Sequence, residues 1–211
     1  MKPTNEMKSM HSDLVRTALL AALISTLPAV CARGESAEFK SEPDKSMAAA
    51  HESFVKGNLD KASEELSKAA TFVKGQSEHV GEESRAGLKH AGDQLQKLGD
   101  DVKAGTVKSD TELKNTYAKV DHEIASCWHR TAEHSRQAGE DSTEALKHAA
   151  NALQNGAKWS GTQLSEGAQA SVDAVKKAGR KTGEGAKAGA RDVDKWLKGI
   201  GDGIEDLGRK L

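Results

Sequence analysis

The sequence has few aromatic residues and few prolines. Phe, Trp and Tyr together make 3% of its 211 residues, and only three residues are proline. Aromatic side chains bury large apolar areas, so their scarcity argues against a large globular core. The scarcity of proline leaves long stretches free to form uninterrupted helix. We therefore predict an all-α fold, an elongated antiparallel helical bundle.

An excess of charge of one sign is also missing. The chain carries 31 basic and 32 acidic residues, for a formal net charge of -1. A near-neutral chain provides no global field that would attract nucleic acid. We expect no nucleic-acid partner.

Catalytic signatures are absent as well. The sequence contains no GxSxG, no glycine-rich phosphate loop, no CxxC and no CxxCH. Ser, His and Asp are plentiful, but none lies in the strand-turn-helix context of a nucleophile site. We expect neither an enzyme nor a bound cofactor.

The N-terminal segment has the layout of a secretory signal peptide. Basic residues precede an uncharged run at 17–30, which is shorter than the roughly 20 residues that a helix needs to cross a bilayer. Val30 and Ala32 suit the positions before a cleavage site. We expect residues 1–32 to be removed and the protein to be exported to the periplasm or secreted. A lipid anchor on Cys31 is the less favoured alternative.

Cleavage at that site leaves Cys127 as the one cysteine of the mature chain. A lone thiol in an oxidising compartment is either buried or paired with another chain. Free cysteine behaves as a small apolar residue, which favours the buried thiol.

Helix start and stop signals divide the middle of the chain. After a flexible leader at 33–43, a short helix at 44–56 ends at Gly57 and Asn58 and forms a hairpin with the next helix. A break is expected between Gly75 and Gly81, since glycine disfavours helix.

Further helices complete the predicted bundle. Ser109 and Glu112 form a capping box that starts a helix at Asp110. Short connections then predict three antiparallel helices at 82–104, 110–138 and about 142–165. The hairpin and bundle together span 44–141.

The sequence predicts one long helix followed by a glycine-rich tail over 142–211. Its small apolar residues recur mostly in blocks of eleven over 142–198, the repeat of a nearly straight helix. Such a helix would extend well beyond its partners. We expect its exposed stripe to contact a partner through Val172, Val175, Val193, Trp196 and Leu197.

Four histidines are candidate metal ligands. His90, His122, His129 and His148 lie on neighbouring predicted helices, although none shows the i, i+4 spacing of a helical metal pair. Solvated or stripe-flanking histidines are the simpler interpretation. A transition-metal site or a proton-responsive cluster requires that the four face one another.

Two short stretches resemble known families. The turn Gly57-Asn58-Leu59-Asp60-Lys61-Ala62 resembles the helical hairpin of tetratricopeptide-type repeats over 44–74. The stretch Ala186-Lys187-Ala188-Gly189-Ala190-Arg191-Asp192 is similar to the eleven-residue repeats of late embryogenesis abundant proteins over 142–198, which would imply a stress-protective helix. The whole chain resembles exported all-helical proteins of bacteria, a resemblance that implies no activity.

Three functions follow as hypotheses. The first is a non-catalytic exported protein that binds a protein or envelope partner, or itself, as a scaffold or chaperone-like component. The second is an amphipathic stress-protection protein with weak contact to anionic membranes. The third is a periplasmic metal-binding or metal-responsive protein that uses the four histidines.

Overall fold

A computed structural model describes residues 42–181 and 189–211. These residues form only helices, with no strand among them, which confirms the predicted all-α class. The predicted signal peptide, Cys31 and residues 33–41 of the predicted leader lie outside the described residues. The elements are α2 (Glu42–Val55), α3 (Leu59–Gln76), the 3-10 helix η1 (Ser77–His79), α4 (Glu82–Lys103), α5 (Asp110–Gln137), α6 (Thr143–Ser160), α7 (Glu166–Lys181) and α8 (Ala190–Lys210).

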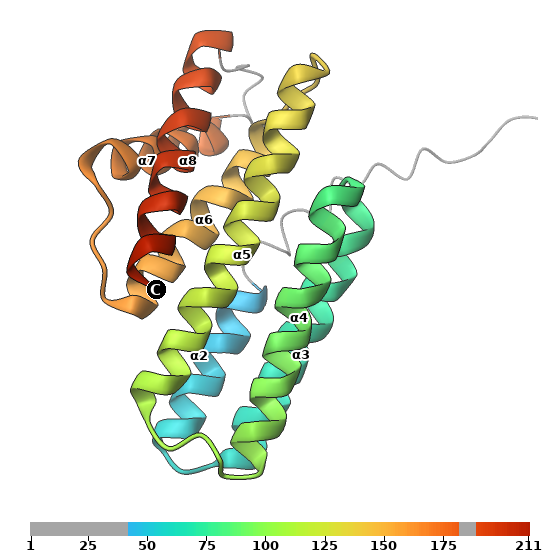
Figure 1. Ribbon diagram of the computed structural model, residues 1–211, viewed down its shortest axis with the longest axis vertical. Coiled ribbons are helices and arrows are strands. Elements are labelled where there is room, and N and C mark those ends of the chain that lie inside the picture. Colours follow the sequence, from blue (N-terminus) through green and yellow to red (C-terminus); the bar gives the residue numbers. More distant parts are fainter. Residues whose placement is uncertain (1–41, 182–188) are drawn as a thin grey trace, which may run out of the picture. The chain divides into compact units, whose positions relative to one another are not determined.

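Helix α5 is the central element of the described chain. On one side it packs against α4 and α2, and α3 lies against both α2 and α4. On the other side it packs against α6 and α8, and α7 lies against both of these (Figure 1). Nearly all the large buried side chains therefore belong to one continuous core.

The hairpin of α2 and α3 forms where the sequence predicts it. Gly57 adopts a φ of 74°, a left-handed conformation that glycine accepts without strain. The Asn58 side chain then caps α3 by accepting a hydrogen bond from the Lys61 backbone N–H. The predicted break is present too: α3 ends at Gln76, and α4 begins after Gly81.

Helix α5 begins at Asp110, as predicted. The Ser109 hydroxyl accepts from the Glu112 backbone N–H at 3.1 Å. The return bond differs from that of a standard capping box, because the Glu112 carboxylate accepts from the Lys108 N–H at 3.0 Å, one residue before the cap. The first of these bonds satisfies a donor that the helix start leaves unpaired.

The single long helix predicted over 142–198 does not form. Gly161 takes a left-handed φ of 68°, and the Thr162 N–H bonds back to the Ala157 carbonyl at 2.9 Å. This is the pattern of a helix C-terminus, so α6 ends at Ser160. Helices α7 and α8 then pack back on α6.

Small residues allow α7 and α8 to approach each other and α6 closely. A Cβ added at Gly203 would lie 2.8 Å from both Ala168 Cβ and Leu153 Cδ2. One added at Gly199 would lie 2.9 Å from Ser171 Cβ and 3.1 Å from the Gly167 carbonyl oxygen. The small-residue stripe is therefore an internal packing seam.

We predict that Gly199→Ala destabilises the protein by about 1–3 kcal/mol, because the added methyl group forces α7 and α8 apart. Gly167→Ala is the matched control, since a Cβ at this position of α7 meets nothing within 4 Å. The control should leave stability unchanged or raise it by up to about 1 kcal/mol through helix propensity. Urea unfolding followed by circular dichroism measures both. Equal effects of the two substitutions would contradict the close seam.

Candidate functional site

A small hollow lies where α2, α5 and α6 meet. Its volume is about 20 Å³, which is room for about one water molecule. Two carboxylates, one from α2 and one from α5, share its lining with an imidazole and an amide. The lining residues are Pro43, Asp44, Asp121, Ile124, His148, Asn151 and Ala152.

Asp121 is the most deeply buried acid of this site. Only 2% of the residue is exposed, and its Oδ2 atom has no hydrogen-bond partner. Loss of hydration raises the pKa of this carboxyl well above its ordinary value, and the nearby charge of Asp44 raises it further. Burial therefore favours the protonated, neutral form of Asp121 more than it is favoured in a solvated aspartate.

Asp44 lies close to the start of α2 and faces the same hollow. Burial raises its pKa from an ordinary value of 3.8 to about 6. The Asn155 amide donates to Asp44 Oδ1 at 2.7 Å and partly offsets this rise, as do the charges of Lys176 and Lys158. The site thus contains two acids with raised pKa values, Asp121 on α5 with the larger rise and Asp44 on α2 with the smaller one.

Aromatic rings extend the site along the seam. Tyr117 precedes Asp121 by one helical turn, and its buried hydroxyl has no hydrogen-bond partner. Burial, and then the charge of Asp121, raise the pKa of this phenol. The Tyr117 ring packs edge-on against Trp159, with ring centroids 5.0 Å apart. The His148 ring stacks at a tilt on Trp128 with centroids 4.4 Å apart. These rings leave little water to stabilise ionised carboxylates.

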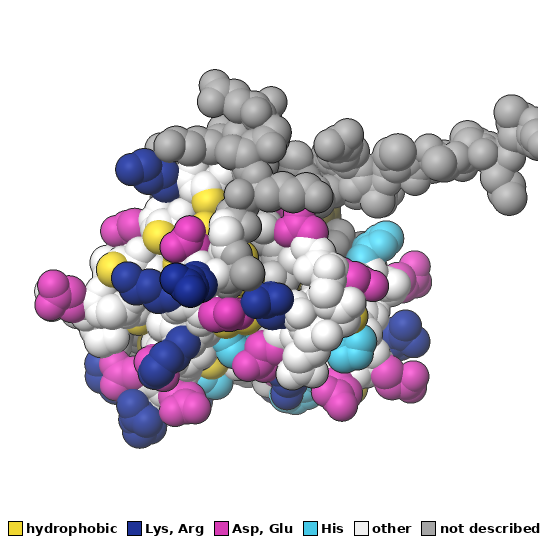
Figure 2. Space-filling model, turned by 90° about the horizontal axis from the view of Figure 1, so that it is seen from above, with side chains coloured by type: hydrophobic (Ala, Val, Ile, Leu, Met, Phe, Trp, Pro, Cys, Tyr) yellow, Lys and Arg dark blue, Asp and Glu magenta, His cyan; other side chains and the backbone are white. Residues whose placement is uncertain are grey.

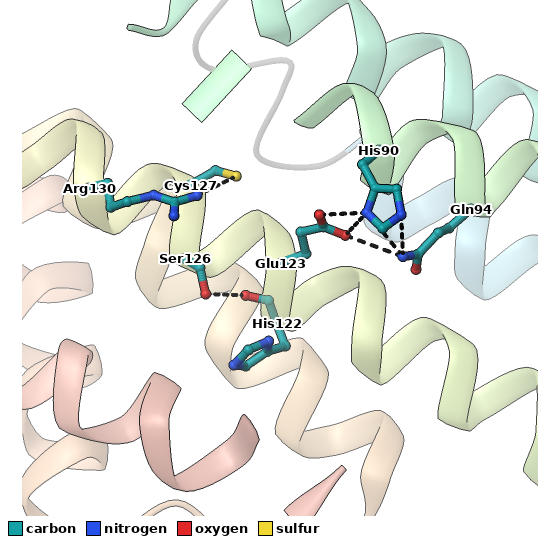
Figure 3. A network of polar contacts seen from close by, with 7 residues as sticks. All are labelled: His90, Gln94, His122, Glu123, Ser126, Cys127 and Arg130. Atoms are coloured by element: carbon teal, nitrogen blue, oxygen red, sulfur yellow. Dashed lines mark hydrogen bonds and ion pairs between the residues drawn. The ribbon is translucent and has the colours of Figure 1, made fainter. Parts of the chain in front are cut away.

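The structure does not bring the four predicted histidine ligands together. His90 is exposed on α4 and bonds to Glu123 through its Nδ1 at 2.7 Å, with Gln94 beside it. Figure 3 shows His122 directed away from this group, although it adjoins Glu123 in sequence. Within residues 42–181 and 189–211, no group of three or more His, Cys, Asp or Glu side chains could hold a metal ion.

Two of these histidines instead attach α8 to α5. His122 and His129 are two turns apart on one face of α5, and their Nε2 atoms lie 3.1 Å and 2.9 Å from the backbone carbonyl oxygens of Ile204 and Leu197. His148 belongs to the carboxylate site described above. The expectation that all four face one another is therefore wrong, because α5 directs His122 and His129 toward α8 and its Glu123 toward His90 on α4.

The predicted partner-binding residues are also in a different place from the one expected. They are buried in the core because α7 and α8 fold back on α5 and α6. The exposed fractions are 0% for Val172 and Val175, 7% for Val193 and 9% for Trp196 and Leu197. This apolar stripe is covered by the chain itself, so the prediction of an exposed docking stripe is wrong.

Cys127 is a buried free thiol, as predicted. Its Sγ lies against Gly87 and accepts a weak hydrogen bond from Arg130 at 3.6 Å (Figure 3). Burial raises the pKa of the thiol, and Arg130 only partly offsets this effect. A protonated, covered thiol is a poor nucleophile.

A large hollow lies on the described surface between α3 and α4. This open groove has a volume of about 950 Å³. Acidic side chains, two lysines and short hydroxyl side chains line it, with Phe72 as the one aromatic residue. The lining residues are Asp60, Ser63, Glu64, Ser67, Lys68, Thr71, Phe72, Asp100 and Lys103.

Elsewhere the described surface is polar. Val55 is the only large hydrophobic residue of the described part that is strongly exposed. Lysine and arginine side chains are interspersed with aspartate and glutamate on the face that Figure 2 shows. None of the described helices combines the length and the apolar character that spanning a membrane requires.

Comparisons with known proteins add no family to this description. No protein-family model matches the chain, and no curated protein or solved structure matches it.

We predict that His129→Ala destabilises the protein by about 1 kcal/mol or more, because it removes a hydrogen bond between α5 and α8 and the packing of a mostly buried ring. His90→Ala is the matched control. Its side chain is 63% exposed, against 14% for His129, and its ion pair with Glu123 should contribute less than about 0.5 kcal/mol. Thermal and urea unfolding of both variants measure the difference. A larger loss from His90→Ala would contradict the anchoring role of His129.

Proposed function

We propose that this chain is a non-catalytic, exported helical protein that acts by binding a protein partner. The observation that carries the proposal is the open groove between α3 and α4. We propose this groove as the binding surface instead of the C-terminal stripe that the sequence predicts, because the residues of that stripe are buried in the core.

The open shape of the groove suits a segment of another protein better than a small molecule. Small-molecule sites enclose the greater part of their ligand. This groove is open and carries charges of both signs, with Asp60 and Glu64 on α3 and Asp100 on α4 near Lys68 and Lys103. Mixed charges and hydroxyls around a single aromatic ring resemble the polar rim and small apolar centre of a protein interface.

The rigid setting of the groove supports the same proposal. Gln96 on α4 donates to the Ser67 hydroxyl on α3 at 3.2 Å, and Lys74 on α3 pairs with Asp93 on α4 at 2.7 Å. A Cβ added at Gly99 would lie 3.3 Å from Leu66 Cβ, so the two helices are in close contact below the groove. A preorganised surface loses less conformational entropy on binding.

The membrane alternative has less support from the described residues. Binding at a membrane interface grows with the apolar area that a helix can insert. The apolar faces of α7 and α8 are covered by the rest of the fold, and strong exposure of a large apolar side chain is confined, in the described ranges, to Val55.

A photo-crosslinking residue tests the proposal. We expect a benzophenone amino acid at Thr71, an exposed groove position, to give a protein adduct of defined mass when the full chain is incubated with an envelope extract. The same residue at Lys119, an exposed position on α5, should not give this adduct. Reversing the acidic charges with Glu64→Lys and Asp100→Lys should abolish it, because the polar match is lost.

Mass spectrometry of the adducts separates the outcomes. Equal adducts from Thr71 and Lys119, or an adduct that persists after charge reversal, would contradict binding through the groove. Adducts to phospholipid alone would favour the membrane alternative.

A further inference from the structure

We propose that Asp44 and Asp121 form a proton-operated latch that holds the start of α2 against α5 and α6. The latch is closed when the carboxyl pair holds protons and loosens when both groups ionise. It is separate from the groove between α3 and α4.

The geometry places two acids around one narrow hollow. Asp44 and Asp121 line the same hollow. Only 2% of Asp121 is exposed, and its Oδ2 atom has no hydrogen-bond partner. A buried carboxylate with an unsatisfied oxygen is costly, whereas a carboxylic acid can donate its proton to a neighbouring oxygen or to one water. The Tyr117 hydroxyl, also without a partner, is one helical turn away on the same helix.

The two neighbouring lysines do not offset the burial of Asp44. His148 of α6 lines the same hollow as the two acids, and Tyr117 lies one helical turn before Asp121 on α5. Two cations act on Asp44 from a distance: Lys158 of α6, which lies over the Trp159 ring at 5.7 Å, and Lys176 of α7, which donates to the Gln154 side chain. Neither replaces the hydration that burial removes, because the net shift of the Asp44 pKa is upward.

A proton fits the seam better than a metal ion does. The hollow has room for about one water. No trio of potential metal-binding side chains was found in the described residues, those of the hollow included. A proton is a cation that two carboxyls of one hollow can share without further ligands.

The direction of the pH effect follows from the raised pKa values. Because the folded pair binds protons more tightly than the detached pair, its contribution to stability is fully present below the ordinary pKa of 3.8. That contribution is lost as the pH rises through the Asp44 pKa of about 6, and Asp121 extends the loss to higher pH. The start of α2 should therefore be docked more firmly at mildly acidic than at alkaline pH.

Hydrogen exchange of the full chain tests the latch. After correction for the intrinsic exchange rate, we expect amides 46–50 of α2 to open about tenfold more at pH 8 than at pH 5, since one unit of pKa difference corresponds to a tenfold change in an equilibrium. The double variant Asp44→Asn and Asp121→Asn should show equal protection at both pH values. It should also melt at a higher temperature than the natural sequence at pH 8, because amides avoid the cost of ionising a buried carboxyl.

Two further variants keep the test decisive. Asp173→Asn, at an exposed aspartate of α7, is the matched control and should retain the full pH dependence. Asp44→Asn alone replaces the double variant if the latter fails to fold by circular dichroism, and it should reduce the pH dependence. Protection of α2 that is the same at pH 5 and pH 8, or a pH dependence unchanged in the Asn variants, would overturn the latch.

Discussion

The structure depends on close approach between helices that have few large apolar side chains. With so few aromatic residues, the core consists mainly of Leu, Val, Ile and Ala. Dispersion contacts fall off steeply with distance, so small side chains stabilise a core only when the helix backbones come close together. Gly156, Gly199 and Gly203 make this possible, since a side chain at each of them would collide with the neighbouring helix.

Close packing explains why α8 needs its partners. Four glycines in this helix cost about 1 kcal/mol each relative to alanine, so its own helix propensity is poor. The structure offsets this cost through docking on α5, α6 and α7. The Arg136 guanidinium of α5 adds two hydrogen bonds to the Asp194 carboxylate of α8, and His122 and His129 contact α8 carbonyls. The stability of α8 as a helix therefore depends on its contacts with α5, α6 and α7.

The local signals in the sequence identify most of the helices correctly. Gly57 with Asn58, Ser109 with Glu112, and Gly139 act through nearest neighbours, so their effect does not depend on the rest of the fold. Gly161 was the exception. Its neighbours Ser160 and Leu164 continue the helical repeat, and an eleven-residue pattern cannot distinguish one long helix from shorter helices that fold back on the same stripe. The energy that decides this choice comes from contacts of α7 and α8 with α5 and α6, which are distant in sequence.

The candidate sites depend even more on these distant contacts. The histidine prediction placed the four residues on neighbouring helices, but the sequence does not show which faces of those helices meet. That packing determines whether His122 meets a metal ligand or a carbonyl of α8. Asp121 did leave a signal, since it follows Tyr117 by four residues and Val120 by one, on the buried side of α5. A buried carboxylate at such a position either has a hydrogen-bond or charge partner or has a shifted pKa. The sequence could not predict which, because Asp44, its counterpart on α2, is 77 positions earlier (121 minus 44).

The same packing that stabilises the fold also perturbs its acids. A core of small side chains leaves little space between the helices, and the hollow beside Asp121 is therefore too small to admit bulk water. The cost of ionising Asp44 falls on α2, which has fewer contacts with α5 than α6 has. Helices α2 and α6 enclose the carboxyl pair together with α5. A change in the protonation of the pair would therefore displace α2 before α6. Sensitivity to pH at this seam is a direct consequence of building a tight core from small residues.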